Sequence, residues 1–148
     1  MVGRVFGEVG RPQNVYFGGN LKTDLVRHEE RMTEFLLSCW PDRWLRLWNV
    51  DDKLRPDGEL WFGNTHLYAE LDVGTVPLTR VSKKMMKYER LMEHGSFVVW
   101  VTLRESRVQG LMKRVGKLAD RALFTVLGWD RWIDANGETI PFLSGEKQ

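Results

Sequence analysis

Residues 56–72 read PDGELWFGNTHLYAELD, and this stretch sets three acidic side chains around two strand-like runs. Gly63–Asn64 separates the runs, and a turn pair of this kind between two strands predicts a β-hairpin. Side chains alternate along a strand, so Glu70 and Asp72 share one face with Tyr68. The opposite face carries only apolar side chains, from Leu67, Ala69 and Leu71.

The shared face suits a metal site. Glu70 and Asp72 lie about 7 Å apart along a strand, so both reach one hard divalent cation, directly or through water. Asp57 opens the neighbouring strand and completes a three-carboxylate set for Mg²⁺ or Mn²⁺. Such a site activates water and neutralises charge on a phosphodiester. The alternative is that these acids are solvated strand ends or turn formers, and spacing alone leaves both interpretations open.

The rest of the chain alternates helix-period and strand-period segments. Helices are predicted over residues 20–40, 78–94 and 105–119. Further strands are predicted over 43–50, 96–103 and 122–129, with short strands at 5–6 and 15–17 and a hairpin on Asn136–Gly137. The order predicts an α/β fold: a three-strand meander followed by helical crossovers, giving a mixed central sheet flanked by helices.

Length and composition predict one folded domain over residues 1–148. Within it we expect short strands in residues 1–20 and a hairpin followed by a tail in residues 128–148. The hydrophobic fraction is 43% and seven residues are tryptophan, which excludes a disordered chain. The single Cys39 excludes an internal disulfide and a thiolate metal site. No apolar run is long enough to cross a membrane and no secretory signal is visible, so we expect a cytoplasmic protein.

Pro56–Asp57 followed by Glu70-Leu71-Asp72 resembles the signature of the PD-(D/E)XK nuclease superfamily. That resemblance implies an αβββαβ restriction-endonuclease-like core, with Asp57 and Glu70 as metal ligands. Enzymes of this superfamily carry a lysine where this chain has Asp72, so the amine that orients water or stabilises the transition state must come from elsewhere.

The run from Tyr68 to Leu91 is similar to the plasmid replication-relaxation protein family, whose pattern is roughly Glu-x-Asp-x-Gly-Thr, then Lys and Tyr one helical turn apart. The matching positions here are Glu70, Asp72, Gly74, Thr75, Lys84 and Tyr88. The upstream His28–Glu29 pair and the stretch GRPQNVYF extend the resemblance over about residues 10–127. Members of this family usually carry a winged-helix DNA-binding region before this half.

Two further residues are candidates for catalysis. Lys84 and Tyr88 share one face of the helix that follows the third strand, so Lys84 is a candidate for the missing amine. Its alternative is the solvated face of an amphipathic helix. Glu29 borders the apolar stripe of the first helix, and the superfamily often uses an acid there as a ligand or as a neighbour of one. The adjacent His28 is more often structural than catalytic.

Basic residues predict contacts with DNA. Arg107, Arg114 and Arg121 recur at seven-residue steps, which places them on one face of a helix. The candidate DNA-binding residues are Lys83, Lys87, Arg107, Lys113, Arg114, Lys117 and Arg121. An ordinary solvated helix face explains them equally well, since the net charge is only +2.

Two functions follow from these predictions. The first is a metal-dependent DNA endonuclease, structure-selective and linked to plasmid or mobile-element DNA, with Asp57, Glu70, Asp72, Lys84 and Glu29 as catalytic residues. A homodimer suits it, because nucleases that cut both strands commonly need two sites. The second is a non-catalytic DNA-binding accessory protein of plasmid replication with a degenerate nuclease fold. An interaction module with no nucleic-acid partner is the third alternative.

Overall fold

The structure is a computed structural model that describes residues 2–6, 12–16, 23–46, 54–92 and 95–140. Seven strands form the main sheet, and a separate hairpin pairs β1 with β2. The strands are β1 (Val2–Phe6), β2 (Pro12–Tyr16), β3 (Arg43–Leu45), β4 (Gly58–Phe62), β5 (Thr65–Asp72), β6 (Ser96–Thr102), β7 (Ala122–Val126), β8 (Trp132–Asp134) and β9 (Thr139–Ile140). The helices are α1 (Thr23–Cys39), α2 (Leu78–Leu91), α3 (Glu105–Met112) and the short 3-10 helix η1 (Gly116–Leu118).

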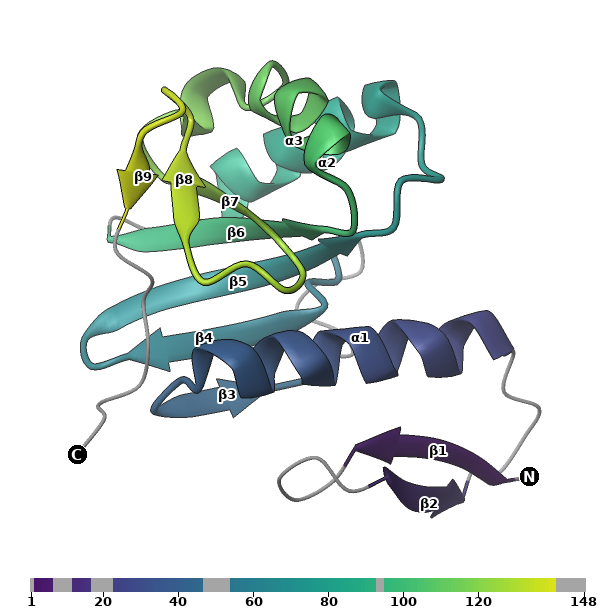
Figure 1. The fold of residues 1–148 in the computed structure, drawn as a ribbon. Helices are drawn as coiled ribbons and strands as arrows, with labels where there is room; N and C mark the ends of the chain where they lie inside the picture. The colour runs from purple at the N-terminus through teal and green to yellow at the C-terminus, as the bar shows by residue number, and fades with distance from the viewer. Residues whose placement is uncertain (1, 7–11, 17–22, 47–53, 93–94, 141–148) are drawn as a thin grey trace.

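Helices cover both faces of the main sheet: α2 and α3 lie on one face and α1 lies on the other (Figure 1). The strand order follows the chain from β3 to β9. β3, β4 and β5 are antiparallel neighbours, whereas β5, β6 and β7 are parallel and joined by helical crossovers. The order α1–β3–β4–β5–α2–β6 is the αβββαβ succession of elements expected from the sequence. The predicted mixed α/β fold is therefore confirmed.

The side chains of β5 alternate between the two faces of the sheet, as its sequence predicts, and both faces are buried at the end of the strand. Leu67, Ala69 and Leu71 pack in the core between the sheet and α1. Tyr68 packs against the core between the sheet and α2 with α3, so Glu70 and Asp72 face those helices. The continuous apolar run of β6 contributes side chains to both cores, which is why that strand shows no polar face.

Some predicted boundaries were wrong. The third helix was expected over 105–119, but α3 ends at Met112 and Gly116, with φ of 54°, begins η1 instead. The helical face predicted from Arg107, Arg114 and Arg121 therefore does not exist as one continuous surface. β3 covers only Arg43–Leu45 of the strand predicted over 43–50, whose later residues lie outside the described ones.

The strand predicted over 122–129 ends at Val126, and the short strands predicted at 5–6 and 15–17 overlap β1 and β2. Other predicted elements agree more closely with the described ones. The β4–β5 hairpin turns at Gly63, whose φ of 58° suits glycine, and the last hairpin turns at Gly137. α2 starts at Leu78 as predicted and ends at Leu91, ahead of the predicted end at His94, which lies outside the described residues. Every helix in the described part of the chain is too short or too polar to span a bilayer.

Candidate functional site

Asp57 lies immediately before β4 and bonds to β5. Its backbone N–H donates to the carbonyl of Ala69 at 3.0 Å, and its carboxylate Oδ2 accepts from the N–H of Leu71 at 2.7 Å. The β4–β5 ladder begins with Gly58 opposite Ala69, so no residue of β4 faces Leu71. The Asp57 side chain supplies the missing acceptor, because a strand N–H without a partner costs free energy. The aspartate is thus held at the end of the strand by the fold itself.

A series of polar contacts connects Asp57 to α1. His28 Nε2 lies 3.4 Å from Asp57 Oδ1, and His28 Nδ1 lies 3.9 Å from Glu29 Oε1. Arg46 Nη2 donates to the same oxygen of Glu29. The contact with Asp57, followed by that with Glu29, raises the pKa of His28 to about 9, so the ring is an imidazolium at neutral pH. In the described residues Glu29 meets Asp57 only through His28.

These contacts also fix the charge of the two carboxyl groups. Burial alone would raise the pKa of Asp57, but the hydrogen bond and charge of His28 outweigh it and leave the pKa lowered. The same balance lowers the pKa of Glu29, where His28 and Arg46 outweigh burial. Asp57 is therefore an anion held against an imidazolium at neutral pH.

Glu70 is the buried centre of the site, with 2% of its surface exposed. Its Oε2 accepts from Lys84 Nζ at 2.6 Å, and its Oε1 accepts from the hydroxyl of Tyr88. Lys84 and Tyr88 reach one carboxylate together because residues four apart share a face of α2. Burial, followed by the charge of Asp57, raises the pKa of Glu70 to about 8 despite both contacts. The structure thus brings Lys84 to the acid that the sequence placed at the centre.

Tyr88 is wholly buried behind Glu70. Burial and then the charge of Glu70 raise its pKa well above the ordinary value for tyrosine, so it remains a hydroxyl donor. The Tyr88 ring also packs against Tyr68 and Trp100, with ring centroids at 5.8 and 6.4 Å. A rigid aromatic wall therefore holds the donor in place.

Asp72 lines the same cavity as Glu70 but has a different cationic partner. Arg107 Nε donates to Asp72 Oδ2 at 2.7 Å, Arg107 Nη2 donates to Asp72 Oδ1 at 3.2 Å, and Nη2 also donates to the carbonyl of Val76. Across the described ranges, no group of three or more His, Cys, Asp or Glu side chains is arranged to hold a metal ion. The structure therefore couples Asp57 with Glu70 but does not assemble them with Asp72, because α3 supplies a cation that the buried Asp72 needs.

Mg²⁺ fits the Asp57–Glu70 pair in its donor chemistry. A carboxylate has about four lone-pair positions, and the contacts described above occupy one on each oxygen of Glu70. Mg²⁺ takes one or two protein carboxylates, keeps several waters and binds substrate phosphate with its other positions. Two neighbouring carboxylates, one of them deeply buried, satisfy that requirement without Asp72.

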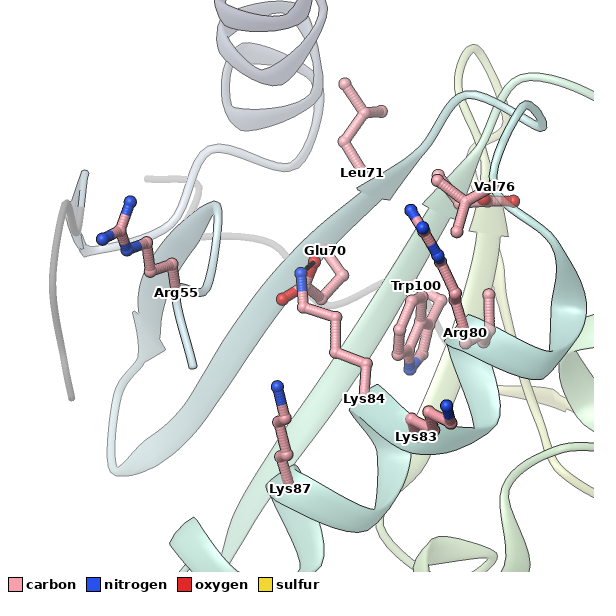
Figure 2. A pocket seen from close by; sticks show the side chains of 11 residues that line it. Arg55, Glu70, Leu71, Val76, Arg80, Lys83, Lys84, Lys87 and Trp100 are labelled. Atoms are coloured by element: carbon pink, nitrogen blue, oxygen red, sulfur yellow. Dashed lines mark hydrogen bonds and ion pairs between the residues drawn. The ribbon is translucent and has the colours of Figure 1, made fainter. Parts of the chain in front are cut away.

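A cavity of about 460 Å³ opens over Glu70. We call it the basic cavity, since its charged lining is mostly cationic. It is lined by Arg55, Glu70, Leu71, Asp72, Val76, Arg80, Val81, Lys83, Lys84, Lys87 and Trp100. Figure 2 shows Arg55 on one side of Glu70 and the cations of α2 on the other. Five cations thus surround two carboxylates that are already paired, and the excess positive charge suits a polyanion.

The predicted DNA-binding residues separate into three groups. Lys83 and Lys87 line the basic cavity. Arg107 is engaged by Asp72, and Arg121 Nη1 donates to the carbonyl of Met92 at 3.5 Å. The rest of the predicted set is exposed beyond the end of α3, outside the lining of the cavity: Lys113, Arg114 and Lys117.

Two cations that line the cavity were not predicted from the sequence, and neither was the contact of Arg107 with Asp72. Arg55 precedes Pro56–Asp57 directly, and that adjacency is the signal that could have placed it beside the acids. Arg80 lies one helical turn before Lys84, on the face that reaches the cavity. Arg107 was predicted to contact phosphate, and no sequence pattern could have paired it with Asp72, 35 residues away.

Comparison with known proteins identifies the family. Residues 19–99 match the model of a family described as replication-relaxation, and this range is more than half of the 148-residue chain. It includes Glu29, Asp57, Glu70, Asp72 and Lys84. No curated protein and no solved structure matches the chain. The chain belongs to the replication-relaxation family.

Proposed function

We propose that the chain is a metal-dependent DNA endonuclease of the PD-(D/E)XK type that acts in plasmid replication or relaxation. Membership of the replication-relaxation family supports a role related to plasmid replication or relaxation, and suggests DNA as the partner. The single observation that carries the enzymatic proposal is the contact of Lys84 Nζ with Glu70 Oε2 at 2.6 Å. It brings an amine to the central acid of a chain that lacks the lysine of the strand motif.

Each residue has a distinct task in this proposal. Asp57 and Glu70 hold Mg²⁺ or Mn²⁺, which when bound neutralises phosphate charge and makes water a better nucleophile. Lys84 donates to a non-bridging oxygen of the scissile phosphate and stabilises the negative charge that develops there. His28 keeps Asp57 ionised and oriented, and Tyr88 fixes the carboxylate plane of Glu70. Hydrolysis forms a bond from the water oxygen to phosphorus and breaks a phosphorus–oxygen ester bond, and the leaving oxygen takes a proton.

Glu29 has an indirect task. Within the described residues its contacts are with His28 and Arg46 and not with Asp57 or Glu70, the two proposed metal ligands. We therefore assign Glu29 to positioning His28. We also leave Asp72 out of the proposed metal ligands, because one guanidinium, from Arg107, donates to both of its oxygens and compensates its charge. The two oxygens of Glu70 instead accept from two different side chains. The proposed catalytic set is therefore Asp57, Glu70 and Lys84.

One observation favours a second function, a DNA-binding accessory protein without catalysis. Position 72 carries an acid where the superfamily has lysine, and that acid is paired with Arg107. A domain that kept the fold and the basic cavity but lost the chemistry would bind DNA and leave it intact.

A cleavage assay separates the two functions. Wild type and Glu70→Gln are incubated with branched, duplex and single-stranded DNA in Mg²⁺, in Mn²⁺ and in EDTA. We expect metal-dependent cleavage by wild type and a loss of at least about 100-fold in Glu70→Gln, since two tasks depend on that carboxylate. Salt-sensitive binding without cleavage in any metal would instead establish the accessory function.

Glu59→Gln is the matched control. Glu59 is a half-buried glutamate of β4 that lies opposite Tyr68 of β5, and so on the same face of the sheet as Glu70. Its Oε1 lies 2.5 Å from His66 Nε2. Glu59 does not line the basic cavity, and it is not one of the groups described above that contact Asp57. The same glutamate-to-glutamine change there should leave cleavage within about two-fold of wild type, and a comparable loss would mean that Glu70→Gln acts through the fold.

A further inference from the structure

The depth at which Glu70 lies restricts the form of DNA that can reach it. Glu70 is 2% exposed, and the neighbouring Asp72 is 5% exposed. Both line the basic cavity, which at about 460 Å³ has the size of a site for one small ligand. Duplex DNA is stiff and presents its phosphates on a convex surface, so a straight duplex rests on the rim. A flexible strand can bend its backbone down to the carboxylate.

The cations of the cavity follow the path that such a strand would take. Arg55 stands before β4 on one side of Glu70, while Arg80 and Lys83 stand on α2 on the other side (Figure 2). Within the described part of the chain, no ion pair joins any of these three to a carboxylate. Lys84, between them, is the cation already paired with Glu70. Unpaired cations on both sides of a recessed acid suit consecutive phosphates of one strand.

We propose that the basic cavity binds a single-stranded or unpaired segment of DNA, gripped by Arg55 on one side and by Arg80 and Lys83 on the other. The inference rests on the proposed function in taking DNA as the ligand, and it adds the form of DNA that is bound.

The test measures binding in EDTA, so that it does not depend on catalysis. Fluorescence anisotropy compares a labelled single strand of about 16 nucleotides, the duplex of the same sequence, and that duplex with an unpaired 3′ extension. We expect the single strand and the extended duplex to bind at least about 10-fold more tightly than the blunt duplex at equal salt. Equal or tighter binding of the blunt duplex would overturn the inference.

Paired variants then locate the site. Arg55→Ala/Arg80→Ala should weaken single-strand binding at least about 10-fold and reduce the slope of log K against log salt by about 1.4, since each strand phosphate contributes about 0.7. The matched control, Lys113→Ala/Arg114→Ala, removes two exposed cations outside the cavity and should change binding by less than about three-fold. An equal loss in both pairs would overturn the assignment to the cavity. Both pairs alter exposed side chains, so thermal unfolding near that of wild type verifies the fold.

The outcomes also separate this inference from the proposed catalysis. Tight single-strand binding without cleavage in any metal refutes the catalysis and leaves the inference standing. Metal-dependent cleavage of blunt duplex at the same rate as single strand refutes the inference and leaves the catalysis standing.

Discussion

Replacing Arg107 with alanine tests whether Asp72 is a structural acid. The Asp72 side chain is 3% exposed and that of Arg107 is 17% exposed, so the pair is largely shielded from water. Removing one partner of a buried ion pair costs about 3–5 kcal/mol, because the other charge stays buried without compensation. Since Arg107 keeps some contact with water, we expect the lower end, a loss of about 3 kcal/mol in the free energy of unfolding. For a chain of this size, that loss lowers Tm by about 6–12 °C.

A double-mutant cycle isolates the pair from the truncation itself. Asp72→Asn removes the charge but retains an acceptor, and in that background Arg107→Ala should cost only about 1 kcal/mol. The expected coupling is therefore about 2 kcal/mol, measured from urea unfolding at neutral pH with unchanged m-values. Arg114→Ala, an exposed arginine just beyond α3, is the control and should stay within about 0.5 kcal/mol of wild type.

The contrary result is as informative. Additive effects, with coupling below about 0.5 kcal/mol, would refute the reasoning that Arg107 compensates a buried Asp72. A stable Asp72→Asn variant that loses all metal-dependent cleavage would return Asp72 to the metal ligands expected from its spacing.

Three further outcomes follow from the site. Lys84→Met should lower cleavage by at least about 100-fold while single-strand binding falls by less than about 10-fold, as quantified by kcat and by anisotropy. Tyr88→Phe removes one buried donor to Glu70 and should cost about 1–2 kcal/mol by urea unfolding, with no change as the contrary result. His28 has a folded pKa of about 9 against 6.5 unfolded, so its stabilisation is complete below pH 6.5 and is lost as pH rises through 9. The difference in unfolding free energy between wild type and His28→Gln should therefore shrink across that range, and a constant difference would contradict the assignment.

The sequence predicted the fold correctly wherever the local pattern of residues agrees with what tertiary packing requires. In β5 the alternation of Leu67, Ala69 and Leu71 with polar residues follows from the pleat, and the structure confirms it. The β4–β5 turn was readable because Gly63 tolerates a positive φ that other residues resist. The third helix was predicted too long because the apolar period continues through Val115 and Leu118, whereas α3 ends at Met112 and Gly116 has a positive φ.

The candidate site was only half readable. Lys84 could be placed near the end of β5 in advance, because a crossover brings the first turns of the following helix over the end of the strand, but its contact with Glu70 was not predicted. Arg107 could not be paired with Asp72, because an ion pair across 35 residues depends on where α3 docks. The contact of His28 with Asp57 depends in the same way on where α1 crosses the sheet.

The sequence by itself determined on which face of β5 Glu70 and Asp72 lie, since side chains along a strand alternate with a period of two. Only the tertiary structure decided how the three acids divide: Asp57 to the imidazolium of α1, Glu70 to the amine of α2, and Asp72 to the guanidinium of α3. The physical reason is that a buried carboxylate requires a compensating charge, and the nearest cation is set by helix docking. That division leaves Asp57 and Glu70 as the proposed metal ligands and gives Asp72 a structural partner.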